Sequence, residues 1–93
     1  MTLTLLTRAY CHLCDEMLAG LRPLAASHAA SIRVVDVDAD RDLEAAFGDH
    51  VPVLFAGEPA TGVELCRHRL DRARVAAALA GSGAPTGRGR NGG

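Results

Sequence analysis

Two cysteines, Cys11 and Cys14, are separated by two residues and lie between an apolar stretch and a helical pattern. A pair with this spacing can bind a metal, form a structural disulfide or exchange electrons. At the N-terminus of a helix, unpaired backbone N–H groups and the helix dipole stabilise the Cys11 thiolate and lower its pKa. Cys14 is then one turn further on, more buried and within reach of the first sulfur. The pattern favours Cys11 as the attacking thiolate and Cys14 as the residue that resolves a mixed disulfide.

The rest of the composition narrows the class of protein. Three cysteines are an odd number, which argues against a disulfide-stapled secreted scaffold. The segment MTLTLLT carries no positive charge and no cleavage site, and it is too short to cross a membrane. We therefore expect a cytoplasmic protein without membrane association, in which a C-x-x-C pair is catalytic or metal-binding. Ten arginines and no lysine are balanced by eleven acids, so nucleic-acid binding is not expected.

Hydrophobic periodicity predicts seven elements in the order β-α-β-α-β-β-α. The predicted strands are 2–6, 32–37, 51–55 and 62–66, and the predicted helices begin at Leu13, span about 41–47, and run from the N-cap Asp71 to Gly81. The first two strands should be parallel across a helical crossover, and the last two should form an antiparallel hairpin. This is an α/β fold, a four-stranded mixed sheet flanked by helices, in one domain over residues 1–81. The Gly-rich residues 82–93 are predicted to be a disordered tail.

Local signals add detail to these elements. Pro23 should kink the first helix or end it early. The nearly continuous β-branched residues of 32–37 are typical of a strand that is covered on both faces. Asp38 or Asp40 should cap the helix at 41–47, and Gly48 should end it in the left-handed conformation.

Two stretches, RAYCHLC (8–14) and VPVLF (51–55), resemble those of small glutaredoxin-like and thioredoxin-like proteins of the thioredoxin-fold superfamily. The resemblance covers about residues 2–80. It implies a thioredoxin fold and a dithiol–disulfide oxidoreductase that needs no bound organic cofactor. The substrate would be a disulfide-containing protein or glutathione, with electrons from glutathione or a reductase, and we expect a monomer. It also implies a cis Val51–Pro52 bond that faces the cysteines, with the Val51 backbone offered to an extended substrate.

Other residues near the cysteines are candidates for tuning the thiolate or binding substrate. Arg8 stands where glutaredoxins usually have a lysine, and it would supply positive charge to the thiolate or to a glutathione carboxylate. Tyr10 stands where many thioredoxins have a tryptophan, and a cation at His12 would help to hold the thiolate. His68 and Arg69 roughly replace the two glycines whose backbone receives glutathione in glutaredoxins. The predicted substrate-binding residues are Arg8, Tyr10, His12, Val51 and Pro52.

Two other classes of function remain open. Cys11, Cys14, Cys66 and His68 have the residue types of a zinc site, or of an iron–sulfur site, if the fold brings them together. A redox-inert adaptor that retains only the fold is the other class. Cys66 is either a small buried hydrophobe or a third thiol near the active site, since the predicted hairpin places it or its neighbour opposite Pro52. The segment RHRLDRAR (67–74) is either a solvated face or a contact for an anion or an acidic partner.

Overall fold

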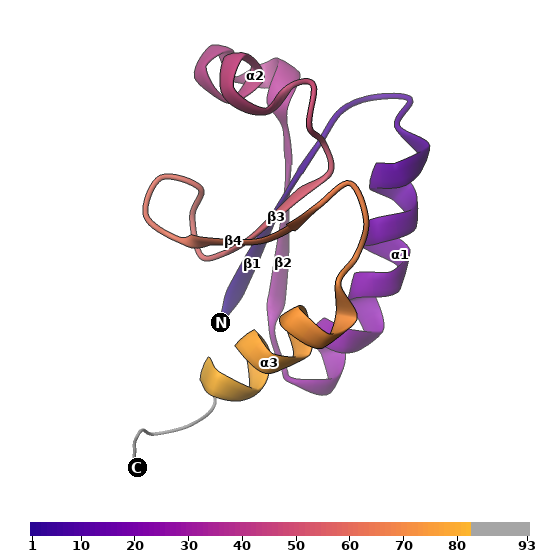
Figure 1. Cartoon of the computed structure of the whole chain (residues 1–93), viewed down its shortest axis with the longest axis vertical. Coiled ribbons are helices and arrows are strands. Elements are labelled where there is room, and N and C mark those ends of the chain that lie inside the picture. Colours follow the sequence, from indigo (N-terminus) through magenta and orange to yellow (C-terminus); the bar gives the residue numbers. More distant parts are fainter. Residues whose placement is uncertain (83–93) are drawn as a thin grey trace.

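A four-stranded mixed sheet forms the centre of the computed structural model, which describes residues 1–82 (Figure 1). Its strands are β1 (Thr2–Thr7), β2 (Ser31–Asp36), β3 (Val53–Ala56) and β4 (Val63–Arg67), in the spatial order β2-β1-β3-β4. β1 pairs in parallel with β2 and antiparallel with β3, and β3 pairs antiparallel with β4. The predicted parallel first pair and the final hairpin are both confirmed.

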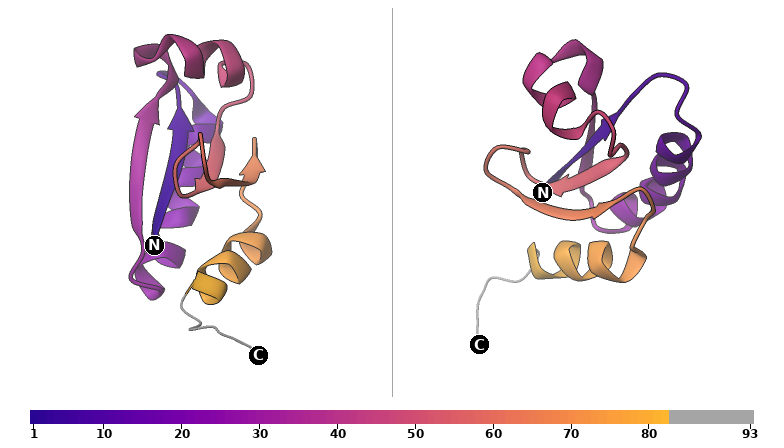
Figure 2. Two further views of the ribbon diagram at one scale, coloured as in Figure 1. Left: turned by 90° about the vertical axis from the view of Figure 1, so that its left-hand side faces the viewer. Right: turned by 45° about the horizontal axis from the view of Figure 1, so that its top comes forward.

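Helices cover the two faces of this sheet. They are α1 (His12–Ser27), α2 (Arg41–Phe47) and α3 (Arg72–Ser82), and a short 3-10 helix, η1 (Val37–Ala39), precedes α2. α1 and α3 pack on one face of the sheet, and η1 and α2 pack on the other (Figures 1 and 2). The predicted order of the elements is therefore confirmed, with η1 as an addition.

Alternation along the strands divides the core into two clusters, because successive side chains of a strand point to opposite faces. Leu3 and Leu5 of β1 face α1 and α3, whereas Leu6 faces α2. The larger cluster consists of Leu3, Leu5, Met17, Leu21, Ala25, Leu54, Leu65, Val75 and Leu79. The smaller one consists of Leu6, Val37, Val53 and Phe55. The first helix is thus fixed to the sheet by apolar packing along its length.

β2 departs from its prediction. It is an edge strand, and Val34 in its middle is 48% exposed, so the prediction that it is covered on both faces is wrong. The helices cover β1 and β3, the two central strands, more completely. Val37 does not belong to this strand; it lies in η1 and is fully buried.

Two helix boundaries also differ from prediction. α1 does not end early at Pro23 but continues to Ser27, because its buried face extends beyond the exposed proline to Ala25, and this packing offsets the lost hydrogen bond. A kink at Pro23 stays a prediction. Gly48 follows α2 in the right-handed conformation, with φ −53°, so the predicted left-handed cap is wrong. The glycine provides space instead: a Cβ there would lie 2.6 Å from the Glu44 carbonyl oxygen and 3.2 Å from Nη2 of Arg8.

The ends of the predicted elements shift by one or two residues. β3 begins at Val53 rather than at residue 51, because its first pair in the ladder is Leu6 with Val53. α3 ends at Ser82, and the remainder of the predicted tail lies outside the described residues. Within residues 1–82, no helix is long and apolar enough to cross a membrane.

The division of the core between the two faces of the sheet leads to a prediction for two residues that are partners across β1 and β2. Leu5 is fully buried and pairs across the sheet with the half-exposed Val34. Leu5→Ala should lower the free energy of unfolding by about 2–5 kcal/mol, because it leaves a cavity between the sheet and α1. The matched Val34→Ala change should cost no more than about 1 kcal/mol. Urea unfolding followed by circular dichroism measures both, and similar losses for the two variants would contradict this assignment of the core.

Candidate active site

Cys11 and Cys14 form the start of α1. Cys11 is the N-cap residue, with extended backbone angles, and its Sγ accepts a hydrogen bond from the Cys14 backbone N–H at 3.1 Å. The two Cα atoms are 5.2 Å apart, within the range that a disulfide requires, and the sulfurs are paired as a disulfide. Cys11 is partly exposed, whereas Cys14 is only 2% exposed. A reactant from solvent therefore meets Cys11 first.

The position of Cys11 has an electrostatic consequence. The first N–H groups of a helix lack partners within the helix, and the helix dipole places positive potential at this end. A sulfur at the N-cap lies in that potential and already accepts one of these N–H groups. Such a position stabilises a thiolate relative to a thiol. The predicted location of Cys11 at the mouth of a helix is confirmed.

Three connections meet at the same end of the sheet as the cysteine pair. Residues 8–11 follow β1, residues 48–52 precede β3, and residues 68–71 follow β4. Leu6 pairs with Val53, and Val53 pairs with Arg67, so these strand ends are neighbours. The Val51–Pro52 peptide bond is cis, Pro52 is buried, and its carbonyl accepts the His68 backbone N–H at 2.8 Å.

Tyr10 and His12 are the neighbours of Cys11 in the sequence, and both are exposed. Tyr10 is completely exposed (106%), and its φ of 59° lies in the left-handed region. This conformation costs a residue with a Cβ roughly 1–2 kcal/mol. His12 is the first residue of α1 and is also exposed. Both side chains are available to a molecule that approaches the cysteines.

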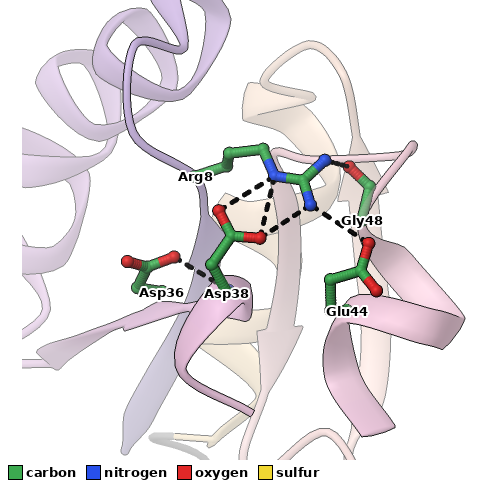
Figure 3. A network of polar contacts seen from close by, with 5 residues as sticks. All are labelled: Arg8, Asp36, Asp38, Glu44 and Gly48. Carbon is green, nitrogen blue, oxygen red and sulfur yellow. Dashed lines mark hydrogen bonds and ion pairs between the residues drawn. The ribbon is translucent and has the colours of Figure 1, made fainter. Parts of the chain in front are cut away.

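Arg8 links the segment before the cysteines to η1 and α2, which cover the face of the sheet opposite to α1 (Figure 3). Its guanidinium donates to Asp38 Oδ1 at 2.7 Å, to Glu44 Oε2 at 3.1 Å and to the Gly48 carbonyl at 2.9 Å. The hydrogen bonds to Asp38 and Glu44 raise the pKa of Arg8, and the guanidinium lowers the pKa of the Asp38 carboxyl. Arg8 therefore positions the loop. A contact between Arg8 and the thiolate or a ligand stays a prediction.

Three aspartates at the end of β2 and directly after it make different contacts. Asp36 caps η1 by accepting the Asp38 N–H at 2.9 Å. Asp40 caps α2 by accepting two backbone N–H groups, as one of the two predicted caps, and Asp38 pairs with Arg8 instead. The sequence reasoning missed this ion pair, because its partners are 30 residues apart and only the fold brings them together.

Cys66 does not lie at its predicted register. It pairs with Leu54, and His68, two residues later, is the residue bonded to Pro52, because β4 continues to Arg67. The prediction that Cys66 or its immediate neighbour is opposite Pro52 is therefore wrong. The thiol is partly buried, and burial raises its pKa. It is consequently less ionised at neutral pH than an exposed cysteine.

The fold does not gather the residues of the predicted metal site into one cluster. In the part of the chain that the structure describes, no group of three or more His, Cys, Asp or Glu side chains is arranged to hold a metal ion. The set Cys11, Cys14, Cys66 and His68 thus fails as a single site. The hairpin instead brings His68 near His50, with 6.2 Å between ring centroids. The sequence reasoning missed this pair, which depends on the hairpin register.

Comparison with known families decides the class of this domain. The model of the Glutaredoxin-like domain (DUF836) matches residues 2–80. The chain belongs to this glutaredoxin-like family. Its thioredoxin-like α/β fold, predicted from the two motifs, is confirmed, and the cysteine pair at disulfide distance is consistent with redox function. Among curated proteins, none matches the chain.

Solved structures agree with this assignment. Protein Ne2328 from Nitrosomonas europaea is 37% identical, with a TM-score of 0.72, over 84% of this chain and 89% of that one. Target protein XcR50 from X. campestris is 38% identical, with a TM-score of 0.59, over 89% of this chain and 99% of that one. Thioredoxin 1 from Thermosipho africanus TCF52B is 19% identical, with a TM-score of 0.61, over 90% and 100% of the two chains, and it shows the fold alone.

The Arg8 contacts make a prediction about acid stability. Pairing with Arg8 lowers the pKa of Asp38 below its ordinary value of 3.8 in the folded state. The unfolded chain then binds more protons, so this stabilisation is present above pH 3.8 and is lost as the pH falls through the lower folded value. Asp38→Asn should lower the urea midpoint at pH 7, and its difference from the wild type should shrink in acid.

Asp49→Asn is the matched control, because Asp49 is exposed and forms no ion pair among the described residues. Its urea midpoint should follow that of the wild type at both pH values. A difference between Asp38→Asn and the wild type that stays constant down to acid pH would show that the Arg8 pair does not stabilise the fold.

Proposed function

We propose that this glutaredoxin-like domain is a dithiol–disulfide oxidoreductase. The observation that carries the proposal is the Cys11 Sγ at the N-cap of α1, hydrogen-bonded to the Cys14 N–H and paired with the Cys14 sulfur. The exposure of the two residues supports separate roles, because Cys11 is partly exposed and Cys14 is buried. Cys11 is the nucleophile and Cys14 the resolving thiol.

The reaction proceeds through a mixed disulfide. The Cys11 thiolate attacks one sulfur of the substrate disulfide, a bond forms between the two sulfurs, and the other substrate sulfur leaves as a thiolate that takes up a proton. The Cys14 thiolate then attacks Cys11 Sγ and expels the second substrate thiol. Two electrons have passed to the substrate, and the Cys11–Cys14 disulfide remains. Two thiols of a soluble reductant, glutathione or the dithiol of a reductase, reduce it again.

Substrate binding is assigned to the groups around Cys11. An extended substrate segment pairs with the backbone of Val51, which precedes the buried cis Pro52 at the same end of the sheet. The exposed Tyr10 provides an aromatic surface beside the sulfur, and His12 adds a cation when it is protonated. The partner is a disulfide-containing protein or glutathione. The domain acts as a monomer in the cytoplasm, without nucleic acid or membrane.

Three serine variants test the proposal. Cys11→Ser should reduce turnover of a disulfide substrate to the uncatalysed rate, because no other described thiol is both accessible and at a helix N-cap. In the absence of free thiol, pre-reduced Cys14→Ser should stop after the first step and accumulate a mixed disulfide, which mass spectrometry detects as a mass increase equal to the bound thiol. Cys66→Ser should keep nearly full activity, since its thiol is partly buried and its pKa is raised.

The readout is the rate of reductant consumption with a disulfide peptide or glutathione disulfide as substrate. An active Cys11→Ser variant would contradict the assignment of the nucleophile. A wild-type protein that reduces neither substrate, with glutathione or with a dithiol reductase as electron donor, would favour the redox-inert adaptor.

A further inference from the structure

A groove opens beside the cysteine pair, between α1 and the segment that connects β4 to α3. Its volume is about 350 Å³. Leu13, Glu16 and Met17 of α1 form one wall, and His68, Arg69 and Arg72 are on the other. Leu13 lies between the two cysteines in the sequence, and the backbone of His68 is bonded to Pro52. The groove therefore adjoins both parts of the proposed active site.

The positive charges of Arg69 and Arg72 in the groove have no evident role in stabilising the fold. Within residues 1–82, Arg8, Arg33 and Arg67 form ion pairs, whereas Arg69 and Arg72 form none. Arg72 is the first residue of α3, where a positive charge opposes the helix dipole. Both guanidinium groups belong to exposed residues, so they are available to an anionic ligand.

Gly20 of α1 makes room for the Arg72 side chain beside the groove. Glycine is unfavourable inside a helix, yet Gly20 lies within α1. A Cβ at this position would lie 2.9 Å from Leu70 Cδ2 and 3.3 Å from Nη2 of Arg72. The absence of that carbon lets the Arg72 guanidinium lie against α1, at the end of the groove away from Leu13.

We infer that this groove binds an acidic segment of a protein substrate, next to the substrate cysteine that reacts with Cys11. The inference rests on the proposed function and adds the substrate class to it. Side-chain carboxylates of the segment pair with Arg69 and Arg72, and its apolar atoms contact Leu13, which is 42% exposed. Among the described residues that line the groove, Glu16 is the only carboxylate. Its charge disfavours a ligand carboxylate beside it, so we place the acidic side chains of the segment nearer the arginines.

The test uses two disulfide peptides that differ only in charge. One carries Glu or Asp on both sides of its cysteine, and the other carries Gln or Asn. The wild-type protein should reduce the acidic peptide with the higher kcat/KM, and this preference should shrink as salt is added. Arg69→Gln and Arg72→Gln should each lower the ratio of the two kcat/KM values roughly 2- to 5-fold, the effect of losing one exposed ion pair.

Arg41→Gln is the matched control. It removes the same charge from α2, on the opposite face of the sheet, and Arg41 also forms no ion pair among the described residues. For Arg41→Gln, the ratio of kcat/KM for the acidic peptide to kcat/KM for the Gln or Asn peptide should equal that of the wild type. An equal fall in Arg41→Gln would show that net charge alone sets the preference, and the inference would be overturned. It would also be overturned if the arginine variants lose as much kcat/KM with the Gln or Asn peptide as with the acidic peptide.

A binding measurement separates this inference from the proposed function. The acidic peptide with serine in place of cysteine cannot exchange disulfides, so its binding needs no redox activity. Its titration should shift the backbone amide NMR signals of Leu13, Glu16 and Arg69, and the shifts should be lost in the Arg69→Gln/Arg72→Gln double variant. If no disulfide is reduced but these shifts occur, the proposed function fails and the groove still binds acidic segments. If the shifts are missing, the groove assignment is overturned, whatever the activity.

Discussion

The proposed chemistry of this domain depends on one hydrogen bond, from the Cys14 backbone N–H to the Cys11 sulfur at the start of α1. It holds the sulfur in the positive potential of the helix N-terminus and keeps the second cysteine one turn away. The hydrogen bond can serve this purpose only if the first turn of α1 is fixed relative to the sheet. Apolar packing of Met17, Leu21 and Ala25 against β1 and β3 fixes it from one side. Arg8, which ties the preceding loop to α2, fixes it from the other.

Two glycines make room for two arginines near this site. Gly48 has no Cβ where the Arg8 guanidinium reaches the end of α2, and Gly20 has none where Arg72 lies against α1. Neither glycine is in the left-handed conformation. Their role is close approach, and each allows a charged group to bridge elements that are distant in the sequence. Among the described residues other than glycine, positive φ occurs at Tyr10, Ala29 and His68. Tyr10 precedes Cys11 and the His68 N–H is bonded to the Pro52 carbonyl, so two of these three residues place backbone strain beside the proposed active site.

Sequence patterns predicted the features that depend on local chemistry. The cysteine pair at a helix N-terminus, the Asp40 and Asp71 caps and the terminal hairpin follow from residue types within a few positions of one another. Features that depend on register or on distant contacts could not be predicted in the same way. The β-branched residues of β2 read as buried, but its place at the edge of the sheet depends on the pairing of β1 with β3. Similarly, the pairing of Arg8 with Asp38 is set by the fold.

The pKa of Cys11 in the reduced protein tests this account most directly. In a variant that retains Cys11 but has serine at positions 14 and 66, the rate of alkylation by iodoacetamide against pH gives this value. The account predicts a midpoint at least one unit below the ordinary thiol value of about 8.5, because the N-cap position stabilises the thiolate. A midpoint at or above about 8.5 would mean that the helix N-terminus does not activate this sulfur, and the central claim would be contradicted.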